Sequence, residues 1–309
     1  MQPQINITER IMYDIIVIGA GPAGLTAAVY AKRAGKDVLV IEKGTFGGQI
    51  TYSPRVENIP GFISLTGNEF AEKLVEQALN LGAEIECAEV LEIKNGDVKT
   101  VVTDSGEFEG KTVIIATGAK HRMLGVDGEE KFVGEGISFC AVCDGAFYEG
   151  KDVAVIGGGN SALQEAILLS ETSRKVYLVQ NLDFITGEKT LYDKLVEKEN
   201  VEIILGATVD SFVGEDELCG IVINTADGKK TLDVDGVFVA IGLIPQNEPF
   251  SNVITLDERG YAAFGEDCIT NTDGIFVAGD CRQKRIRQVA TAASDGAVAA
   301  LAACSYLDR

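Results

Sequence analysis

Two cysteines three residues apart are the first group in the sequence that could do chemistry. Cys140 and Cys143 are followed directly by Asp144. A cysteine pair at this spacing either binds zinc or interconverts between dithiol and disulfide. A structural zinc needs four ligands, but the remaining cysteines are scattered and His121 is the single histidine, so we favour the redox interpretation and expect no metal. One thiolate would attack a disulfide, the other would resolve the mixed disulfide, and Asp144 would protonate the departing thiolate if burial raised its pKa. An aspartate that only caps a turn is the alternative for Asp144.

A glycine-rich turn near the N-terminus has the form that binds the pyrophosphate of a dinucleotide. Gly19, Gly21 and Gly24 follow an apolar run and precede a helix-like stretch. The first glycine permits a tight turn, the second lets the pyrophosphate approach the backbone, and the third lets the helix pack on the strand. The free N–H groups and the dipole of the helix N-terminus favour an anion. Glu42 ends the next strand, where a carboxylate can accept hydrogen bonds from ribose hydroxyls, so we predict a dinucleotide site here.

A second turn of this form, Gly157-x-Gly159-x-x-Ala162, lies about 138 residues further along. Its second strand ends at Gln180, with no carboxylate for a ribose diol and no Lys or Arg for a 2′-phosphate. Gln180 could still hydrogen-bond a ribose hydroxyl. A retained fold with an impaired nucleotide site is therefore an open alternative to a functional second site.

The elements around both turns predict the fold. Each turn lies between two continuous apolar strands joined by a helix, at residues 13–42 and 151–180, and unbroken apolar strands suit a parallel sheet buried on both faces. We predict an α/β protein with two Rossmann-like, three-layer dinucleotide-binding domains, one inserted in the other. The expected boundaries are 1–118 with 245–309 for the first domain and 119–244 for the second. Between the repeats we expect a helix at 67–81 and a small antiparallel sheet at 84–93 and 98–103, and near the C-terminus a helix at 288–301.

The amino-acid composition argues against several classes of function. The chain of 309 residues has 27 basic and 47 acidic side chains and a net charge of −20, which argues against a nucleic-acid or anionic-membrane binder. No apolar run approaches the roughly 18 residues of a membrane helix. The N-terminal ten residues lack the apolar core of a secretory signal, and the scattered cysteines are an odd number, so we expect a cytoplasmic protein with mostly reduced thiols.

The motifs together resemble the low-molecular-weight thioredoxin reductase family of flavoprotein disulfide reductases, nearly end to end from Tyr13 to Leu301. The resemblance rests on GAGPAG at 19–24, Gly47-Gly48-Gln49, Val56-Glu-Asn58-x-Pro-Gly61, Ala116-Thr117-Gly118, CAVCDG at 140–145, Gly279-Asp280 and Arg287-Gln288 leading to ASDG at 293–296. It implies a homodimer that binds FAD in the first unit and a nicotinamide dinucleotide in the second. The two domains would rotate so that the cysteine pair meets either the flavin or thioredoxin.

The resemblance also implies roles for individual residues. Cys143 would face the flavin and form the charge-transfer thiolate, Cys140 would attack the partner disulfide, and Asp144 would be the acid–base. The FAD contacts would be Gly19, Gly21, Pro22, Ala23, Gly24, Glu42, Lys43, Gly48, Gln49, Asn58, Ala116, Thr117, Gly118, Gly279, Asp280, Arg287, Gln288 and Val289. The second, weaker nucleotide site would use Gly157, Gly159, Asn160, Ala162 and Gln180.

The sequence departs from the family at the site that reads the 2′-phosphate. NADPH-using members carry His-Arg-Arg and a further Arg four positions on, whereas this chain has Gln180, Asn181, Leu182 and Thr186. Two lost charge-assisted hydrogen bonds would weaken NADPH binding by about 3–6 kcal/mol. We therefore expect poor use of NADPH and a donor that is NADH, or reduced ferredoxin or flavodoxin as in pyridine-nucleotide-independent members.

Three alternatives stay open at this point. One is an NADPH-dependent thioredoxin reductase with an atypical site, and another is a flavoprotein that senses redox state without turnover. The third concerns the docking of a donor protein. An acidic donor would need a local basic patch on this acidic chain, and residues 284–287 (Lys-Arg-Ile-Arg) are one candidate. The alternative is that these residues form an ordinary solvated surface.

Overall fold

The computed structural model describes residues 12–53 and 55–309. The N-terminal segment on which the expectation about a secretory signal rests lies outside these residues. The chain divides into two compact units. Among the described residues, the first contains 12–53 together with 59–120 and 244–309, and the second contains 55–58 and 121–243. The inserted unit is therefore flanked by two parts of the first, and the short segment 55–58 groups with the second unit.

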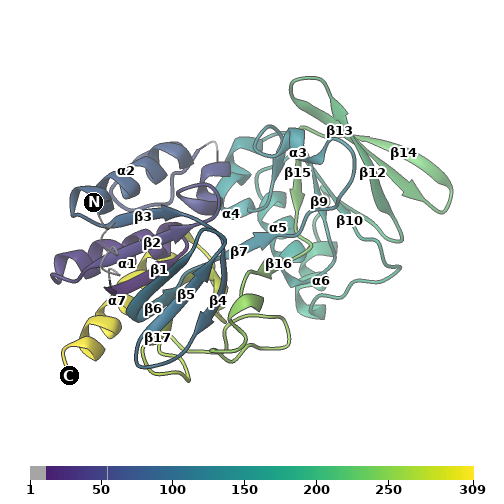
Figure 1. Cartoon of the computed structure of the whole chain (residues 1–309). Coiled ribbons are helices and arrows are strands. Elements are labelled where there is room, and N and C mark those ends of the chain that lie inside the picture. The colour runs from purple at the N-terminus through teal and green to yellow at the C-terminus, as the bar shows by residue number, and fades with distance from the viewer. Residues whose placement is uncertain (1–11, 54) are drawn as a thin grey trace, which may run out of the picture. The chain divides into compact units, whose positions relative to one another are not determined.

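The first unit is built on a mostly parallel sheet in the order β3-β2-β1-β6-β5-β4, with β17 also paired to β6 (Figure 1). Its parallel strands are β1 (Met12–Ile18), β2 (Val38–Glu42), β3 (Glu84–Cys87), β6 (Glu107–Ile115) and β17 (Ile275–Val277). Strands β4 (Val90–Lys94) and β5 (Lys99–Thr103) pair antiparallel with each other, and β5 pairs antiparallel with β6. The expected small antiparallel sheet is thus partly wrong, because residues 84–87 extend the parallel sheet beside β2.

Side-chain alternation along β1 explains the layers of this unit. Ile15 and Val17 belong to one apolar cluster with residues of α1 (Pro22–Arg33) and α7 (Val289–Leu307). Ile16 and Ile18 point to the other face and pack in a cluster with Val90, Ile93 and Val101 of the antiparallel strands. Both faces of the parallel strands are therefore buried, as the unbroken apolar sequence predicted. Helix α2 (Gly67–Asn80) begins with a capping box formed by Thr66 and Glu69.

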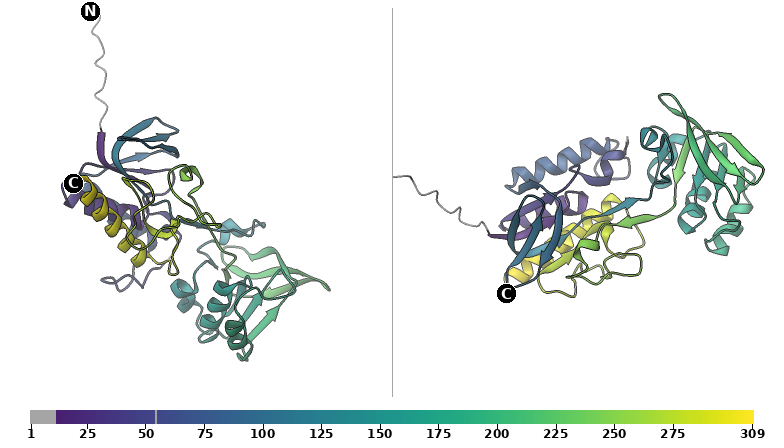
Figure 2. Two further views of the ribbon diagram at one scale, coloured as in Figure 1. Left: turned by 90° about the horizontal axis from the view of Figure 1, so that it is seen from below. Right: turned by 45° about the vertical axis from the view of Figure 1, so that its right-hand side comes forward.

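Helix α7 is the one helix in the described part of the chain that is long and apolar enough to cross a membrane. It lies along α1 (Figure 2) and buries Ala292, Ala299, Ala300 and Ala303 in the apolar cluster of the first unit. Its apolar composition is therefore explained by packing, since a core helix carries a wide apolar face.

The second unit has a five-stranded parallel sheet in the order β11-β10-β9-β15-β8. Its strands are β8 (Ile137–Ser138), β9 (Asp152–Ile156), β10 (Lys175–Val179), β11 (Val201–Ile204) and β15 (Gly236–Val239). Helices α4 (Ala141–Asp144), α5 (Asn160–Ser170) and α6 (Lys189–Val196) belong to this unit, and β12 (Thr208–Gly214), β13 (Leu218–Thr225) and β14 (Gly228–Asp233) form a separate antiparallel sheet. The strands β7 (Ala119–His121) and β16 (Leu243–Pro245) pair with each other, and α3 (Glu129–Phe132) is a short helix. The 3₁₀ turns of the chain are η1 (Gly48–Tyr52), η2 (Gly145–Tyr148), η3 (Glu248–Phe250) and η4 (Gly279–Cys281).

Two Rossmann-like units in one chain confirm the predicted fold class.

Candidate functional site: a disulfide beside a buried aspartate, and two glycine turns

Cys140 and Cys143 form a disulfide, with their Cα atoms 5.3 Å apart. The pair spans α4, a single helical turn for which Cys140 is the N-cap residue. The Cys143 N–H donates to Cys140 Sγ at 3.2 Å, so the turn itself holds the two sulfurs together. The other described cysteines, at positions 87, 219, 268, 281 and 304, are free. The described residues contain no group of three or more side chains that could hold a metal ion.

Asp144 is the last residue of this turn, and Ser138 hydrogen-bonds both to its carboxylate and to the first residue of the turn. The Ser138 hydroxyl donates to Asp144 Oδ2 at 2.6 Å and accepts the Cys140 N–H at 3.1 Å. Burial raises the pKa of the Asp144 carboxyl, and the Ser138 hydrogen bond opposes that rise. The other oxygen, Oδ1, is buried without a hydrogen-bond partner among the described residues. A carboxyl in this environment holds a proton more readily than an exposed one, as a general acid must.

Ser138 is a residue that the sequence reasoning missed. It stands at the end of the short strand β8, two residues before Cys140. The available signal was weak, because a serine close to an aspartate is common in turns and only the fold shows that its hydroxyl joins the two.

The first glycine turn meets the requirements for a bound pyrophosphate. Gly19 has a φ of +106°, and a Cβ on it would lie 2.4 Å from the Ala116 carbonyl oxygen. A Cβ on Gly24 would lie 1.8 Å from the Gly19 carbonyl oxygen, so the helix can approach the strand only with glycine here. A Cβ on Gly21 would meet only the Gly47 carbonyl oxygen, at 3.9 Å, and as the N-cap of α1 Gly21 leaves the first N–H groups without a side-chain cap. These groups are free to receive an anion.

Two further loops of the first unit converge on this turn. The Gly47 N–H donates to the Ala20 carbonyl oxygen at 2.8 Å, and a Cβ on Gly48 would lie 3.3 Å from Gly21 Cα. A Cβ on Gly279 would lie 2.8 Å from Ala23 Cβ. The structure thus brings most of the predicted FAD residues of the first unit to one end of its sheet.

Glu42 occupies the expected position at the end of β2. Its carboxylate accepts the N–H groups of Ala20 and Gly44, both at 2.8 Å, and so fixes the glycine turn relative to the strand. Each carboxylate oxygen can accept more than one hydrogen bond, so acceptors for a ribose diol remain. The neighbouring Lys43 forms an ion pair with Glu89 at 2.9 Å, and Gln49 lies exposed in the 3₁₀ turn η1.

The buried carboxyl of Asp280 tests whether the first unit has room and hydrogen-bonding groups for a polar cofactor. Its Oδ1 atom is buried without a hydrogen-bond partner in the described residues, and the Lys284 ammonium is 3.9 Å away. Burial raises the pKa of the Asp280 carboxyl, while the charges of Lys284 and Arg287 oppose the rise. A buried acceptor of this kind is costly unless a ligand or water hydrogen-bonds to it. Together with the open cradle at Gly21, it shows that the residues present fit FAD.

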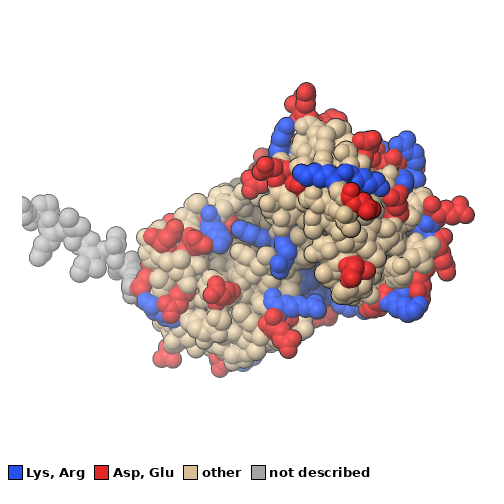
Figure 3. All heavy atoms as spheres, turned by 90° about the vertical axis from the view of Figure 1, so that its right-hand side faces the viewer, with Lys and Arg blue, Asp and Glu red and all other residues tan. Residues whose placement is uncertain are grey.

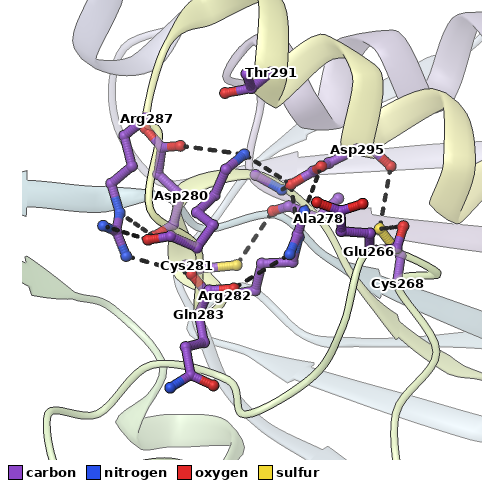
Figure 4. Close-up of polar contacts among 12 residues, drawn as sticks. Glu266, Cys268, Ala278, Asp280, Cys281, Arg282, Gln283, Arg287, Thr291 and Asp295 are labelled. Carbon is purple, nitrogen blue, oxygen red and sulfur yellow. Dashed lines mark hydrogen bonds and ion pairs between the residues drawn. The ribbon is translucent and has the colours of Figure 1, made fainter.

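The basic residues near Asp280 are engaged inside the fold (Figure 4). The Lys284 ammonium donates to Asp295 Oδ2 at 3.0 Å, and Arg282 makes two hydrogen bonds of 2.7 Å to the same carboxylate. The Arg287 guanidinium lies 4.3 Å above the Tyr261 ring and donates to backbone carbonyl oxygens. Of the basic residues at 284–287, Lys284 is 8% exposed and Arg287 is committed, so these two are not free for docking, whereas Arg285 is exposed.

Gln288 and Thr117 take structural roles beside the predicted cofactor site. Gln288 is the N-cap of α7 and forms a capping box with Thr291, so the helix begins where the sequence predicted. The Thr117 hydroxyl donates to Asn247 Oδ1 at 3.2 Å, and Asn247, which is fully buried, donates to the carbonyl oxygens of Gly260 and Cys281. Asn247 is a second residue that the sequence reasoning missed. Asn58, predicted as an FAD contact, falls in the segment 55–58 that groups with the second unit.

The second glycine turn keeps the backbone form of a dinucleotide site. Gly157 has a φ of +133°, and a Cβ on Gly159 would meet only Thr186 Oγ1, at 3.9 Å. Residues 180–188 contain no Lys or Arg. Gln180 is 4% exposed, and its amide donates to the Phe184 carbonyl oxygen at 3.3 Å beneath Gly158. In this arrangement Gln180 supports its own loop instead of reaching towards a ribose. The nearby Asn160 side chain exchanges hydrogen bonds with Glu188.

Comparisons with known proteins agree with this geometry. Residues 13–296 match the family described as pyridine nucleotide-disulphide oxidoreductase. The chain is 41% identical to a thioredoxin reductase of Listeria monocytogenes, over 98% of this chain and 96% of that protein. It is 44% identical to the "34.2 kDa protein in rubredoxin operon" of Clostridium pasteurianum, over 97% and 98% of the two chains. The solved thioredoxin reductase of Streptococcus pyogenes is 39% identical and superposes with a TM-score of 0.92, covering 97% of this chain and 99% of that one.

Two Rossmann-like units, a glycine cradle that fits FAD, and similarity along nearly the whole chain lead to one assignment. The chain belongs to the low-molecular-weight thioredoxin reductase family, whose members are FAD-dependent disulfide oxidoreductases.

Proposed function

We propose that this protein reduces the disulfide of a thioredoxin-type partner through Cys140 and Cys143, with Asp144 as the acid–base. The observation that carries the proposal is the disulfide on a one-turn helix whose N-cap is linked through Ser138 to a buried carboxyl. Such a turn joins the two sulfurs and a proton donor in one short segment of chain.

In the reduced enzyme the Cys140 thiolate attacks one sulfur of the partner disulfide. A mixed disulfide forms, and the departing thiolate takes a proton from Asp144. The Cys143 thiolate then attacks Cys140 Sγ, which releases the second partner thiolate and restores the Cys140–Cys143 disulfide. The partner gains two electrons and the enzyme pair loses two.

FAD, when bound, supplies the two electrons that return the pair to the dithiol. We assign FAD to the first unit, where the turn at Gly19–Gly24, Glu42, the Ala116–Gly118 loop and Asp280 would hold it. The second unit carries the redox pair and the nucleotide-type turn. We further propose that the enzyme acts as a homodimer in the cytoplasm, and the free described cysteines, exposed Cys87 and Cys219 among them, support a reducing compartment.

Replacing Cys143 with serine tests this mechanism. Cys143→Ser removes the resolving sulfur, so we expect thioredoxin reduction to fall by at least about a hundredfold while bound FAD is retained. Absorbance spectra give the flavin content, and insulin precipitation or a coupled assay gives turnover. Cys219→Ser, which changes an exposed free cysteine, is the matched control. Full activity in Cys143→Ser would refute the proposed role of the pair.

We also propose that NADPH is a poor electron donor for this enzyme. Asn181 and Leu182 stand where NADPH-using relatives carry two arginines, and the segment 180–188 offers no other cation. Loss of these contacts would cost about 3–6 kcal/mol, a hundred- to ten-thousand-fold in affinity. The donors that remain are NADH and a reduced ferredoxin or flavodoxin.

Anaerobic stopped-flow bleaching of the flavin ranks these donors directly. We expect slow bleaching at micromolar NADPH and faster bleaching by NADH or by reduced ferredoxin. The double variant Asn181→Arg/Leu182→Arg should bind NADPH at least about tenfold more tightly than the unchanged enzyme. Rapid bleaching of the unchanged enzyme by micromolar NADPH would contradict the proposal. A redox-active pair with no bleaching by any donor would favour the alternative of a redox sensor.

A further inference from the structure

Asp295 of α7 is a buried carboxylate that collects hydrogen bonds from the segment carrying Asp280 (Figure 4). Its side chain is 8% exposed. It accepts the Gly279 N–H at 3.0 Å, two hydrogen bonds of 2.7 Å from Arg282, and the Lys284 ammonium at 3.0 Å. Since Gly279 is the first residue of η4, this carboxylate fixes the turn to α7 and holds the Lys284 ammonium inside the fold.

The ammonium of Lys284 also faces a second carboxyl, that of Asp280. Lys284 Nζ lies 3.9 Å from Asp280 Oδ1, which is close enough for an ion pair and too far for a hydrogen bond. Asp280 Oδ1 is buried and has no hydrogen-bond partner among the described residues. Lys284 therefore provides a charge beside Asp280 and leaves its Oδ1 atom open as an acceptor.

The charges around Asp280 act in opposite directions. Burial raises the pKa of the Asp280 carboxyl, and the charge of Lys284 opposes this rise most, followed by that of Arg287. The charge of Asp295 adds to the rise, and that of Arg282 opposes it. Lys284 is thus the cation that contributes most to keeping Asp280 ionised.

The helices packed against η4 bring no other charge to Asp280. These helices are α7, on which Asp295 is the only charged residue, and α1, whose basic residues Lys32 and Arg33 stand in its last turn. Burial raises the pKa of Tyr261 and raises that of Cys281 to about 11, and the charge of Asp280 adds to both rises. Both groups are therefore neutral near pH 7.

We propose that Lys284, anchored by Asp295, is a positioning residue for FAD: it keeps the Asp280 carboxylate charged, so that Oδ1 accepts a hydrogen bond from the cofactor. This inference rests on the proposed assignment of FAD to the first unit. A hydrogen bond to a charged acceptor is roughly twice as strong as one between neutral groups, so the charge on Asp280 matters for affinity. Lys284 acts through Asp280 and need not touch the cofactor.

This arrangement has a definite consequence for the pH dependence of FAD binding. If the cofactor binds the charged form of Asp280, its affinity is constant above the pKa of that carboxyl and falls as the pH drops through it. Removing the Lys284 ammonium removes the largest effect that opposes burial, so the pKa of Asp280 rises further. The loss of affinity should then begin at higher pH.

A double-mutant cycle on the holoenzyme separates this role from simple support of the turn. Dilution of the holoenzyme, with fluorescence detection of the released flavin, gives the dissociation constant of FAD. At pH 7, Lys284→Met should weaken FAD binding by at least about tenfold, whereas Lys284→Arg, which keeps the charge, should stay within about threefold of the unchanged enzyme. In an Asp280→Asn background, Lys284→Met should change the dissociation constant by less than about threefold.

Dissociation constants recorded between about pH 5 and pH 8 supply the second readout. The affinity of Lys284→Met should begin to fall at higher pH than that of the unchanged enzyme, and Asp280→Asn should abolish this difference. Lys111→Met is the matched control, because Lys111 of β6 also pairs with an aspartate of the first unit, Asp14, at 2.7 Å. This variant should bind FAD like the unchanged enzyme at every pH.

The cycle also distinguishes the ways in which the inference could fail. An equal loss of affinity from Lys284→Met in both backgrounds would overturn it, since Lys284 would then only support the turn, and so would an unchanged affinity. If Lys284→Met does not fold, Lys284→Gln, which can still donate to Asp295 without a charge, replaces it in the same cycle. Unchanged FAD binding in Asp280→Asn would refute the assignment of FAD to Asp280 itself, and the inference with it.

Discussion

At the scale of single residues, the environment of Asp144 decides whether this chain can move a proton at its disulfide. Burial raises the pKa of the carboxyl, and the hydrogen bond from Ser138 limits that rise. Ser138 also receives the N–H of Cys140, so one hydroxyl sets both the orientation of the acid and the start of the cysteine turn. The sequence CxxC-Asp supplied the reacting groups, but the short strand β8 supplies the group that orients them.

Asp144→Asn should slow thioredoxin reduction by about a hundredfold or more, because asparagine cannot give a proton to the departing thiolate. The flavin content and the Cys140–Cys143 disulfide should be retained, since asparagine can still accept the Ser138 hydrogen bond. Rapid-mixing measurement of thioredoxin reduction by pre-reduced enzyme checks this step alone. Ser138→Ala is the companion variant: it removes a hydrogen bond that lowers the pKa of Asp144, so that pKa should rise. Unchanged kinetics in Asp144→Asn would assign Asp144 a turn-capping role instead.

At the scale of elements, close approaches between α1, β1 and α7 shape the predicted FAD cradle. A Cβ on Gly296 of α7 would lie 2.1 Å from the Ala23 carbonyl oxygen in the first turn of α1. Ala23 lies within the glycine turn, so the position of α7 affects the position of the helix N-terminus that would face the pyrophosphate. A backbone contact this short tolerates glycine alone.

Gly296→Ala should therefore displace α7 from α1 and weaken FAD retention. Overpacking of this kind costs about 1–3 kcal/mol in the free energy of unfolding. Thermal unfolding of the holoenzyme and the flavin-to-protein absorbance ratio after dialysis measure the two effects. Leu301→Ala, at a position of α7 that is 55% exposed, is the control and should change neither. Full flavin retention in Gly296→Ala would show that α7 does not set the cradle.

At the scale of the whole molecule, net charge governs encounters with other proteins. The chain carries −20, and the face in Figure 3 shows acidic and basic side chains interspersed. Of the basic residues predicted as a docking patch, Lys284 is held by Asp295 and Arg287 by Tyr261, which leaves Arg285 exposed. Long-range electrostatics therefore oppose the approach of an acidic donor protein.

Flavin reduction by an acidic ferredoxin should accordingly become faster as ionic strength rises. Screening shortens the range of repulsion from about 30 Å at 0.01 M salt to about 8 Å at 0.15 M, which weakens the barrier to encounter. Stopped-flow rates across this range, at fixed ferredoxin concentration, provide the measurement. NADH, a small donor, serves as the comparison and should respond less. Rates that fall with added salt would reveal an attractive local patch instead.

The sequence alone determined the parts of this protein that depend on local patterns. Unbroken apolar strands, glycine turns and the spacing Cys140–Cys143 fixed two Rossmann-like units and named the groups that could react, because strand burial and tight turns leave signatures within a few residues. The absence of Lys and Arg from residues 180–188 was equally visible.

Only the tertiary structure decided which side chains are available and which are already engaged. Ser138 and Asn247 carry no local signature, since each is defined by groups that are distant in sequence or on another element. Lys284 and Gln180 looked free in the sequence and are buried in the fold. The physical reason is that burial and hydrogen bonding are properties of packed neighbours, and a polar side chain changes from a candidate ligand to a structural support when packing gives it a partner.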